Sequence, residues 1–342
     1  MNNCAFISIE VTQMKNALSY WKRYDLVFKH FSYKKLFKTI LGFAKKLGEP
    51  FTKKSNKGRK HKIAPHEYAS YMAFEIITHN SPYRDMELGS ELYVGKHIDH
   101  STFGKNFIKI PLEYFTKLLT IIAKFLESLL GTALCYIADS SGLVTNTYYD
   151  TEYKGKPIRR RLDYKVHSLI GYYPNKGITY IKNALGTDKH TSDSKGAVKM
   201  LKDYNLGWAY FSADSGYDFE CLHKRIKEKG FYPLVKPRKN KVNRAIVTKK
   251  HRKIFLERVY RELRHVVETI FGGFENKGLL KTKLKRPDTI CKYGVVLQIR
   301  HNMQQLMKLA VENCLKLLFI RQTLLTASLF NNYNIINTML YN

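Results

Sequence analysis

Five short runs of β-branched and aromatic residues between residues 134 and 237 constrain the fold of this chain most strongly. Three of them follow one another directly, and helix-like segments separate the third from the fourth and the fourth from the fifth. Three strands followed by helix, strand, helix and strand predict a mixed sheet, in which an antiparallel meander leads into parallel crossovers. The five runs are LCYIADSSGLVT, YKVHSLIGYY, GITYIKNALG, WAYFSADSG and FYPLVKP.

The part of the chain before these runs has a helical pattern. Its apolar residues recur at spacings of three and four, and three short segments lie between residues 63 and 110, with Pro82 and Asp99 near two helix starts. Three short helices with a basic third member fit a helix-turn-helix module that binds DNA. The predicted division is a helical DNA-binding region at 1–130, an α/β domain at 131–310 and a helical tail at 311–342.

The charge of the chain indicates its partner. Lys and Arg number 59 against 28 Asp and Glu, which gives a net charge of +31. Nucleic acid is the polyanion that such a charge best neutralises, and an anionic membrane or another acidic partner is the alternative. The five cysteines are far apart, and neither a signal peptide nor a membrane span is predicted, so we expect a cytoplasmic, nucleoid-associated protein.

Two basic runs are candidate contacts for DNA phosphates. Residues 53–62 hold six Lys or Arg, and residues 236–253 hold nine without an acidic residue. Each run is either a solvated loop or a segment that lies along the DNA backbone, and the first interpretation does not exclude the second. The predicted phosphate contacts are Lys53, Lys54, Arg59, Lys60, Lys236, Arg238, Lys239 and Lys241.

An Ala-Asp-Ser sequence ends both the first and the fourth run. If those two strands are neighbours, Asp139 and Asp214 lie about 5 Å apart, which is the spacing between strands. A divalent cation between them would offset their repulsion, and ligation by oxygen alone suits Mg²⁺ or Mn²⁺. The alternative is that each aspartate only caps the turn that follows it. The arrangement occurs twice, in a chain whose net charge of +31 suits binding to phosphates, and therefore we favour the metal site over two turn caps.

A two-metal site for phosphodiester chemistry needs a third carboxylate, and the long helix predicted at about 255–276 offers three. Glu262, Glu268 and Glu275 all lie off its apolar stripe, so periodicity does not choose among them. A histidine pair, His97-x-x-His100, has the spacing of a helical metal site. No third ligand is near it in the sequence, so we expect solvated or DNA-facing histidines there.

At this point the sequence resembles the DDE transposases of bacterial and archaeal insertion sequences, whose catalytic domain has a ribonuclease H-like fold. The resemblance runs from about residue 135 to 309, and it is carried by five motifs in order. They are IADSSG, RRLDYKVHSLIG, DKHTSDSKG, SADSGYD and RHVVETIFGGF, the last of which contains Arg-x-x-Val-Glu-x-x-Phe. The gap between the second Asp and this Glu is too short for the large insertion domain of some relatives.

The resemblance implies a site and a reaction. It selects Glu268 as the third acid beside Asp139 and Asp214, with two Mg²⁺ or Mn²⁺ ions, and it makes Arg264 a phosphate contact. Lys165 and His167 also match the family and are predicted DNA contacts. The implied activity is cleavage of DNA at the ends of an insertion sequence and strand transfer into target DNA, by a homodimer that holds both ends.

Two alternatives remain open. One is a decayed transposase that still binds element ends without catalysis, and the other is a hydrolytic nuclease of the same fold. Many relatives place a Tyr seven residues before the Glu and a Lys seven residues after it. This chain has Arg261 and Glu275 there, with Tyr260 and Lys277 close by.

Overall fold

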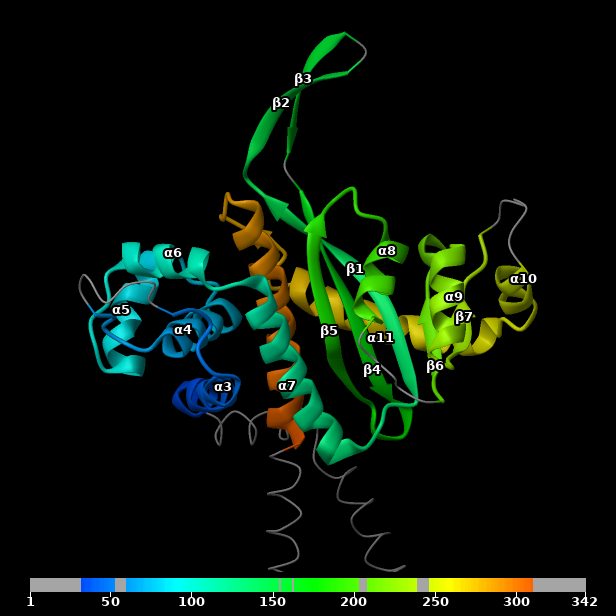
Figure 1. Cartoon of the computed structure of the whole chain (residues 1–342), viewed down its shortest axis with the longest axis horizontal. Coiled ribbons are helices and arrows are strands. Elements are labelled where there is room, and N and C mark those ends of the chain that lie inside the picture. Colours follow the sequence, from blue (N-terminus) through cyan, green and yellow to red (C-terminus); the bar gives the residue numbers. More distant parts are fainter. Residues whose placement is uncertain are drawn as a thin grey trace, which may run out of the picture. The chain divides into compact units, whose positions relative to one another are not determined.

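The computed structural model describes residues 32–52, 60–153, 155–161, 163–202, 208–238 and 246–309. Residues Leu36–Met303 form one compact unit, whose elements are labelled in Figure 1. The other unit, Met1–Lys35 with Gln304–Asn342, lies almost entirely outside the described residues. Five of the predicted DNA contacts and the predicted tail at 311–342 also lie outside them; the five are Lys53, Lys54, Arg59, Lys239 and Lys241.

Helices precede the sheet, as the sequence predicts. The central one, α4, buries ten of its residues, because it is apolar on nearly every side and its neighbours surround it. Pro82 and Asp99 precede α5 and α6, and the Asp99 carboxylate accepts a hydrogen bond from the Ser101 amide. The bounds are α3 Tyr33–Leu47, α4 Pro65–Thr78, α5 Tyr83–Val94, α6 His100–Lys109 and α7 Leu112–Leu130.

The sheet has the order β5-β4-β1-β6-β7, with the short β8 paired to β1. Strand β4 runs antiparallel to both of its neighbours, β5 and β1, whereas β1, β6 and β7 run parallel to one another. This mixed sheet with flanking helices after a helical region confirms the predicted ribonuclease H-like fold class. The bounds are β1 Cys135–Thr145, β4 Tyr164–Tyr173, β5 Ile178–Asp188, β6 Tyr210–Ala213, β7 Tyr232–Val235 and β8 Lys281–Thr282.

Helices cover both faces of the sheet. On β4, His167 faces α8 and the next residue, Ser168, donates a hydrogen bond to Gln298 of the helix at 287–309. Successive strand residues point to opposite faces, so these two helices pack on opposite sides. The remaining helices are α8 Asp193–Met200, α9 Glu220–Glu228, α10 Ile246–Lys253 and α11 Glu257–Glu275, with short 3₁₀ turns at Pro174–Lys176 and Ser215–Tyr217.

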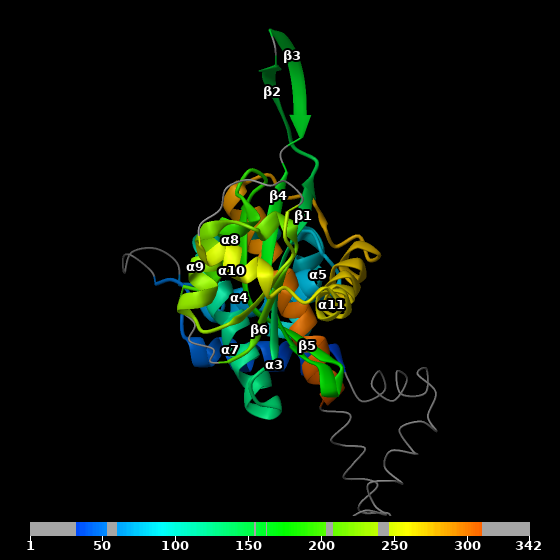
Figure 2. The same cartoon turned by 90° about the vertical axis from the view of Figure 1, so that its right-hand side faces the viewer.

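A hairpin between β1 and β4 was not predicted from the sequence. Strands β2 (Tyr148–Tyr153) and β3 (Lys156–Arg161) pair with each other through a two-residue loop that contains Gly155, whose φ is +72°. Figures 1 and 2 show this hairpin extending beyond the main sheet. The sequences of these strands, YYDTEY and KPIRRR, lack the regular alternation of apolar and polar residues that reveals half-buried strands.

Candidate active site

Asp139 and Asp214 belong to neighbouring parallel strands, and each lies one residue beyond the last pair that joins β1 to β6. The last paired residues of β1 and β6 are Ala138 and Ala213, which lie opposite each other, and each is followed by its aspartate. The neighbouring placement on which the metal prediction depended is therefore present. Asp214 Oδ1 accepts a hydrogen bond from the Gly216 amide (2.9 Å) and caps the turn Ser215–Tyr217, whereas Asp139 Oδ1 accepts from the Ser140 amide (2.8 Å) within β1, which continues to Thr145 and so does not end at Asp139 as the sequence predicts.

Glu268 reaches the same region from α11. This helix buries Leu263, Val267, Ile270 and Phe274, the stripe that the sequence predicts, and packs against β1. Arg264 connects the two elements, because its guanidinium lies 3.7 Å from Asp139 Oδ2 and 3.3 Å from Glu268 Oε1. Within the described residues, the ligand atoms of the three acids do not all lie within 4.8 Å of one another. The positively charged Arg264 therefore lies between Asp139 and Glu268 and offsets part of their negative charge.

Burial gives Asp139 an unusual protonation equilibrium. Its side chain is 15% exposed, and burial raises the pKa of the carboxyl to about 6 against the opposing charge of Arg264. The like charges of Asp214 and Asp193 raise this pKa further. Ionising a buried carboxyl costs free energy. A carboxyl with such a perturbed pKa is typical of a functional site rather than of a turn cap.

A fourth acid, Asp193, enters the site from the first turn of α8. Its Oδ1 accepts hydrogen bonds from the Ser140 hydroxyl (2.8 Å) and the Lys165 ammonium (3.1 Å). The His167 Nδ1 atom lies 3.7 Å from the same oxygen. The sequence analysis did not assign Asp193, because its position became meaningful only when α8 was placed against β4.

Two tyrosines lie close to these acids. Burial and the charges of Asp139, Asp193 and Asp214 raise the pKa of Tyr217 well above its usual value. Burial likewise raises the pKa of Tyr260, and Asp214 and Asp139 contribute to the rise. Tyr260 is buried on α11 whereas the neighbouring Arg261 is exposed, and therefore Tyr260 is the residue of this turn that faces the acids.

Two predicted DNA contacts are engaged inside the protein. His167 is fully buried, its Nε2 lies 2.9 Å from the Thr187 hydroxyl, and burial lowers its pKa to about 4. A neutral, enclosed imidazole cannot neutralise a phosphate, so direct DNA contact does not fit this position. Lys165 is 22% exposed and holds Asp193. Both residues support the acid cluster.

The basic residues near Asp214 divide into two kinds. Arg238 donates hydrogen bonds to the carbonyls of Ser215 (2.9 Å) and Gly216 (3.2 Å) and stacks on Phe219, so it fixes the turn after Asp214. Lys236 is exposed, with its ammonium 5.7 Å from the centre of the Tyr260 ring. Lys60 is also exposed. Lys236 and Lys60 therefore remain accessible to DNA.

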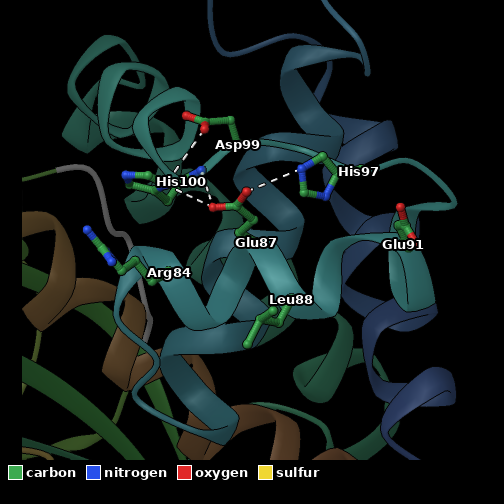
Figure 3. A pocket seen from close by; sticks show the side chains of 7 residues that line it. All are labelled: Arg84, Glu87, Leu88, Glu91, His97, Asp99 and His100. Atoms are coloured by element: carbon green, nitrogen blue, oxygen red, sulfur yellow. Dashed lines mark hydrogen bonds and ion pairs between the residues drawn. The ribbon is translucent and has the colours of Figure 1, made fainter.

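A second cluster of ligand-type side chains lies at the junction of α5 and α6 (Figure 3). Glu87 Oε2 lies 2.8 Å from His100 Nδ1 and accepts a hydrogen bond from the His100 amide, while Glu87 Oε1 lies 3.2 Å from His97 Nε2. The sequence analysis found no third ligand near the histidine pair, and the structure places Glu87 and Asp99 there. Because Glu87 and Asp99 both accept from backbone amides at the start of α6, the cluster caps that helix.

The comparisons agree with this geometry. The mixed sheet has a ribonuclease H-like fold, with Asp139 on β1 and Asp214 after the neighbouring parallel strand β6, and Glu268 comes from α11. Residues 131–293 match the family described as "Transposase DDE domain". This family implies transposase activity, DNA binding and the use of divalent metal ions. No curated protein matches the chain. Among the described residues, no helix combines the length and apolar character needed to cross a membrane.

Proposed function

We propose that this chain is the transposase of an insertion sequence, which cuts DNA at the element's ends and transfers the freed strand into target DNA. Asp139, Asp214 and Glu268 are the acids that act in both steps. Two observations support the proposal: Asp139 and Asp214 each follow one of the paired residues Ala138 and Ala213, and Arg264 contacts both Asp139 and Glu268, although these acids are far apart in the sequence. The match of residues 131–293 to the transposase DDE domain supports it.

The residues present fit divalent metal ions. The donors are carboxylate oxygens without a nearby thiolate, a set that suits Mg²⁺ or Mn²⁺, and the like charges of Asp214 and Asp193 beside Asp139 are ones that a cation would offset. Two such ions, when bound, supply Lewis acidity for the attacking oxygen and the leaving oxygen. Asp139, Asp214 and Glu268 would hold these ions.

Arg264 has two roles in this account. In this structure its guanidinium neutralises Asp139 and Glu268. When divalent cations take over that neutralisation, the guanidinium becomes free to bind a phosphate of the DNA, because arginine pairs well with phosphate oxygens. Lys60 and Lys236, with the two basic runs, hold the DNA backbone, and two copies of the chain hold the two ends of the element.

The test uses DNA that carries the inverted repeats flanking the chain's own coding region. With Mg²⁺ the wild type is expected to cut at the repeat ends and to join them to target DNA. Asp139→Asn, Asp214→Asn and Glu268→Gln are each expected to bind this DNA without cutting it. Glu262→Gln is the matched control, because Glu262 lies on the same helix, is exposed and pairs only with Arg258.

Each outcome separates the proposal from its alternatives. Binding without cutting by the wild type would identify a decayed transposase, and cutting without joining would identify a nuclease. Cutting at the wild-type rate by Asp139→Asn, Asp214→Asn or Glu268→Gln would refute the site. Loss of cutting in Glu262→Gln would show that any change on α11 impairs the enzyme.

A further inference from the structure

Asp193 is held in place by groups from two strands of the sheet. Its Oδ1 accepts from Ser140 on β1 and from Lys165 on β4, and the Lys165 ammonium also donates to the Thr191 carbonyl. Ser140 directly follows Asp139 in the chain. The carboxylate of Asp193 is therefore fixed beside Asp139 by two hydrogen bonds, which restrict its rotation before any ligand binds.

The other oxygen of Asp193 is unused by the protein. Within the described residues, the hydrogen bonds and ion pairs of Asp193 all reach Oδ1 and none reaches Oδ2. A β-carbon added at Gly216 would lie 3.7 Å from Asp193 Oδ2 and 3.0 Å from Asp214 Oδ1. Both carboxylates thus lie close to Gly216. Within the described residues the ligand atoms of Asp139, Asp193 and Asp214 do not all lie within 4.8 Å of one another, so a shared ion requires these side chains to move closer together.

Tyr217 gives an independent indication that a ligand is missing at this point. Its side chain is 1% exposed, and among the described residues its hydroxyl has no partner in hydrogen-bonding geometry, although the Ser140 hydroxyl lies near enough to lower its pKa. An unpaired buried hydroxyl costs about 1–3 kcal/mol, so native proteins rarely leave one without a partner. The charges of Asp139, Asp193 and Asp214 all act on this hydroxyl. A metal-bound water among the three carboxylates would accept its hydrogen bond.

We propose that Asp193 is a fourth acidic ligand of the divalent-cation site, acting with Asp139 and Asp214 through its free Oδ2. The inference rests on the proposed function, because it assumes that a cation binds between Asp139 and Asp214. It extends that function by adding a ligand from α8, an element that none of the three predicted acids occupies.

The competing explanation is structural. Asp193 would then only connect α8 to the sheet through Lys165, and the ligand set would end with Asp139, Asp214 and Glu268. The two explanations differ in what Lys165→Gln does. As a structural connection, the Asp193–Lys165 pair is broken equally in Asp193→Asn and Lys165→Gln. As a ligand, Asp193 keeps its charge in Lys165→Gln and loses it in Asp193→Asn.

The experiment titrates manganese chloride into the metal-free full-length protein and follows the heat of binding, with circular dichroism to check folding. Asp193→Asn is expected to weaken Mn²⁺ binding at least about tenfold, as the loss of a ligand or of its support does. Lys165→Gln is expected to weaken Mn²⁺ binding clearly less than Asp193→Asn, because the carboxylate remains although one hydrogen bond that orients it is lost. Asp163→Asn is the matched control, since Asp163 pairs with Arg161 and Lys189.

The Asp139→Asn variant makes the outcomes distinguishable. It reports any Mn²⁺ bound elsewhere, including at Glu87, Asp99 and His100. If Asp139→Asn loses the binding while Asp193→Asn keeps wild-type affinity, the fourth-ligand inference is wrong and the proposed function stands. Equal weakening in Asp193→Asn and Lys165→Gln would establish the structural explanation. If the wild type binds no more Mn²⁺ than Asp139→Asn, the proposed metal site itself is wrong.

Discussion

Replacing Asp139 with asparagine is expected to stabilise the metal-free protein. The folded protein binds the proton of this carboxyl with a pKa of about 6 instead of the usual 3.8. Folding therefore favours the protonated form, so the contribution of this carboxyl to stability is most favourable below pH 3.8 and is lost as the pH rises through 6. Above about pH 7 the ionised carboxylate costs about 3 kcal/mol. Asparagine removes that cost and can still accept from the Ser140 amide.

The assay is urea unfolding in EDTA, followed by circular dichroism at two pH values. Linkage gives an expected advantage of Asp139→Asn over the wild type of about 1.5 kcal/mol at about pH 5 and about 3 kcal/mol at about pH 8. Asp163→Asn, which removes a carboxylate paired with Arg161 and Lys189, is expected to show no such gain. An Asp139→Asn variant that is no more stable than the wild type at the higher pH, or an advantage independent of pH, would contradict the burial argument.

Three further predictions concern groups around the site. Tyr217→Phe removes an unpaired buried hydroxyl, so thermal unfolding in EDTA should show unchanged or slightly higher stability, by about 1 kcal/mol, while Mn²⁺ affinity falls; a clear loss of stability would mean that the hydroxyl is satisfied. Gly196→Ala puts a β-carbon 2.6 Å from His167 Nδ1 and should cost about 1–3 kcal/mol and slow cleavage, whereas Gly142→Ala, with open space around it, should do neither. Replacing Lys53, Lys54, Arg59 and Lys60 with glutamine should weaken the dependence of DNA affinity on salt. The slope of log affinity against log salt concentration should fall by about 0.9 for each phosphate that is no longer neutralised, and an unchanged slope would exclude these residues from the interface.

The sequence was sufficient for a mixed sheet built from an antiparallel meander and parallel crossovers, and for Asp139, Asp214 and Glu268 as candidates. Apolar runs report buried strands directly, but the turn-forming residues after Asp139 did not mark the end of β1, which continues to Thr145 because it pairs with β4. The choice of Glu268 over Glu262 and Glu275 needed the family motif, because all three lie off the apolar stripe. The contact of Arg264 with both Asp139 and Glu268 is consistent with that choice.

The rest of the site could not be read from the sequence because it depends on packing between distant segments. Asp193 looks like an ordinary acid in the first turn of a helix until α8 lies against β4, where Gly196 allows a close approach to His167. The burial that makes His167 neutral is likewise a property of that packing. Glu87 joins His97 and His100 only through the fold of α5 onto α6.

The most direct test of the central claim is anomalous X-ray scattering from crystals of the protein soaked in Mn²⁺ and bound to its end DNA. The account predicts manganese peaks within bonding distance of Asp139, one shared with Asp214 and one with Glu268, and Arg264 turned towards a phosphate. A map without manganese at Asp139, or with manganese only at the cluster of Glu87, Asp99 and His100, would contradict it.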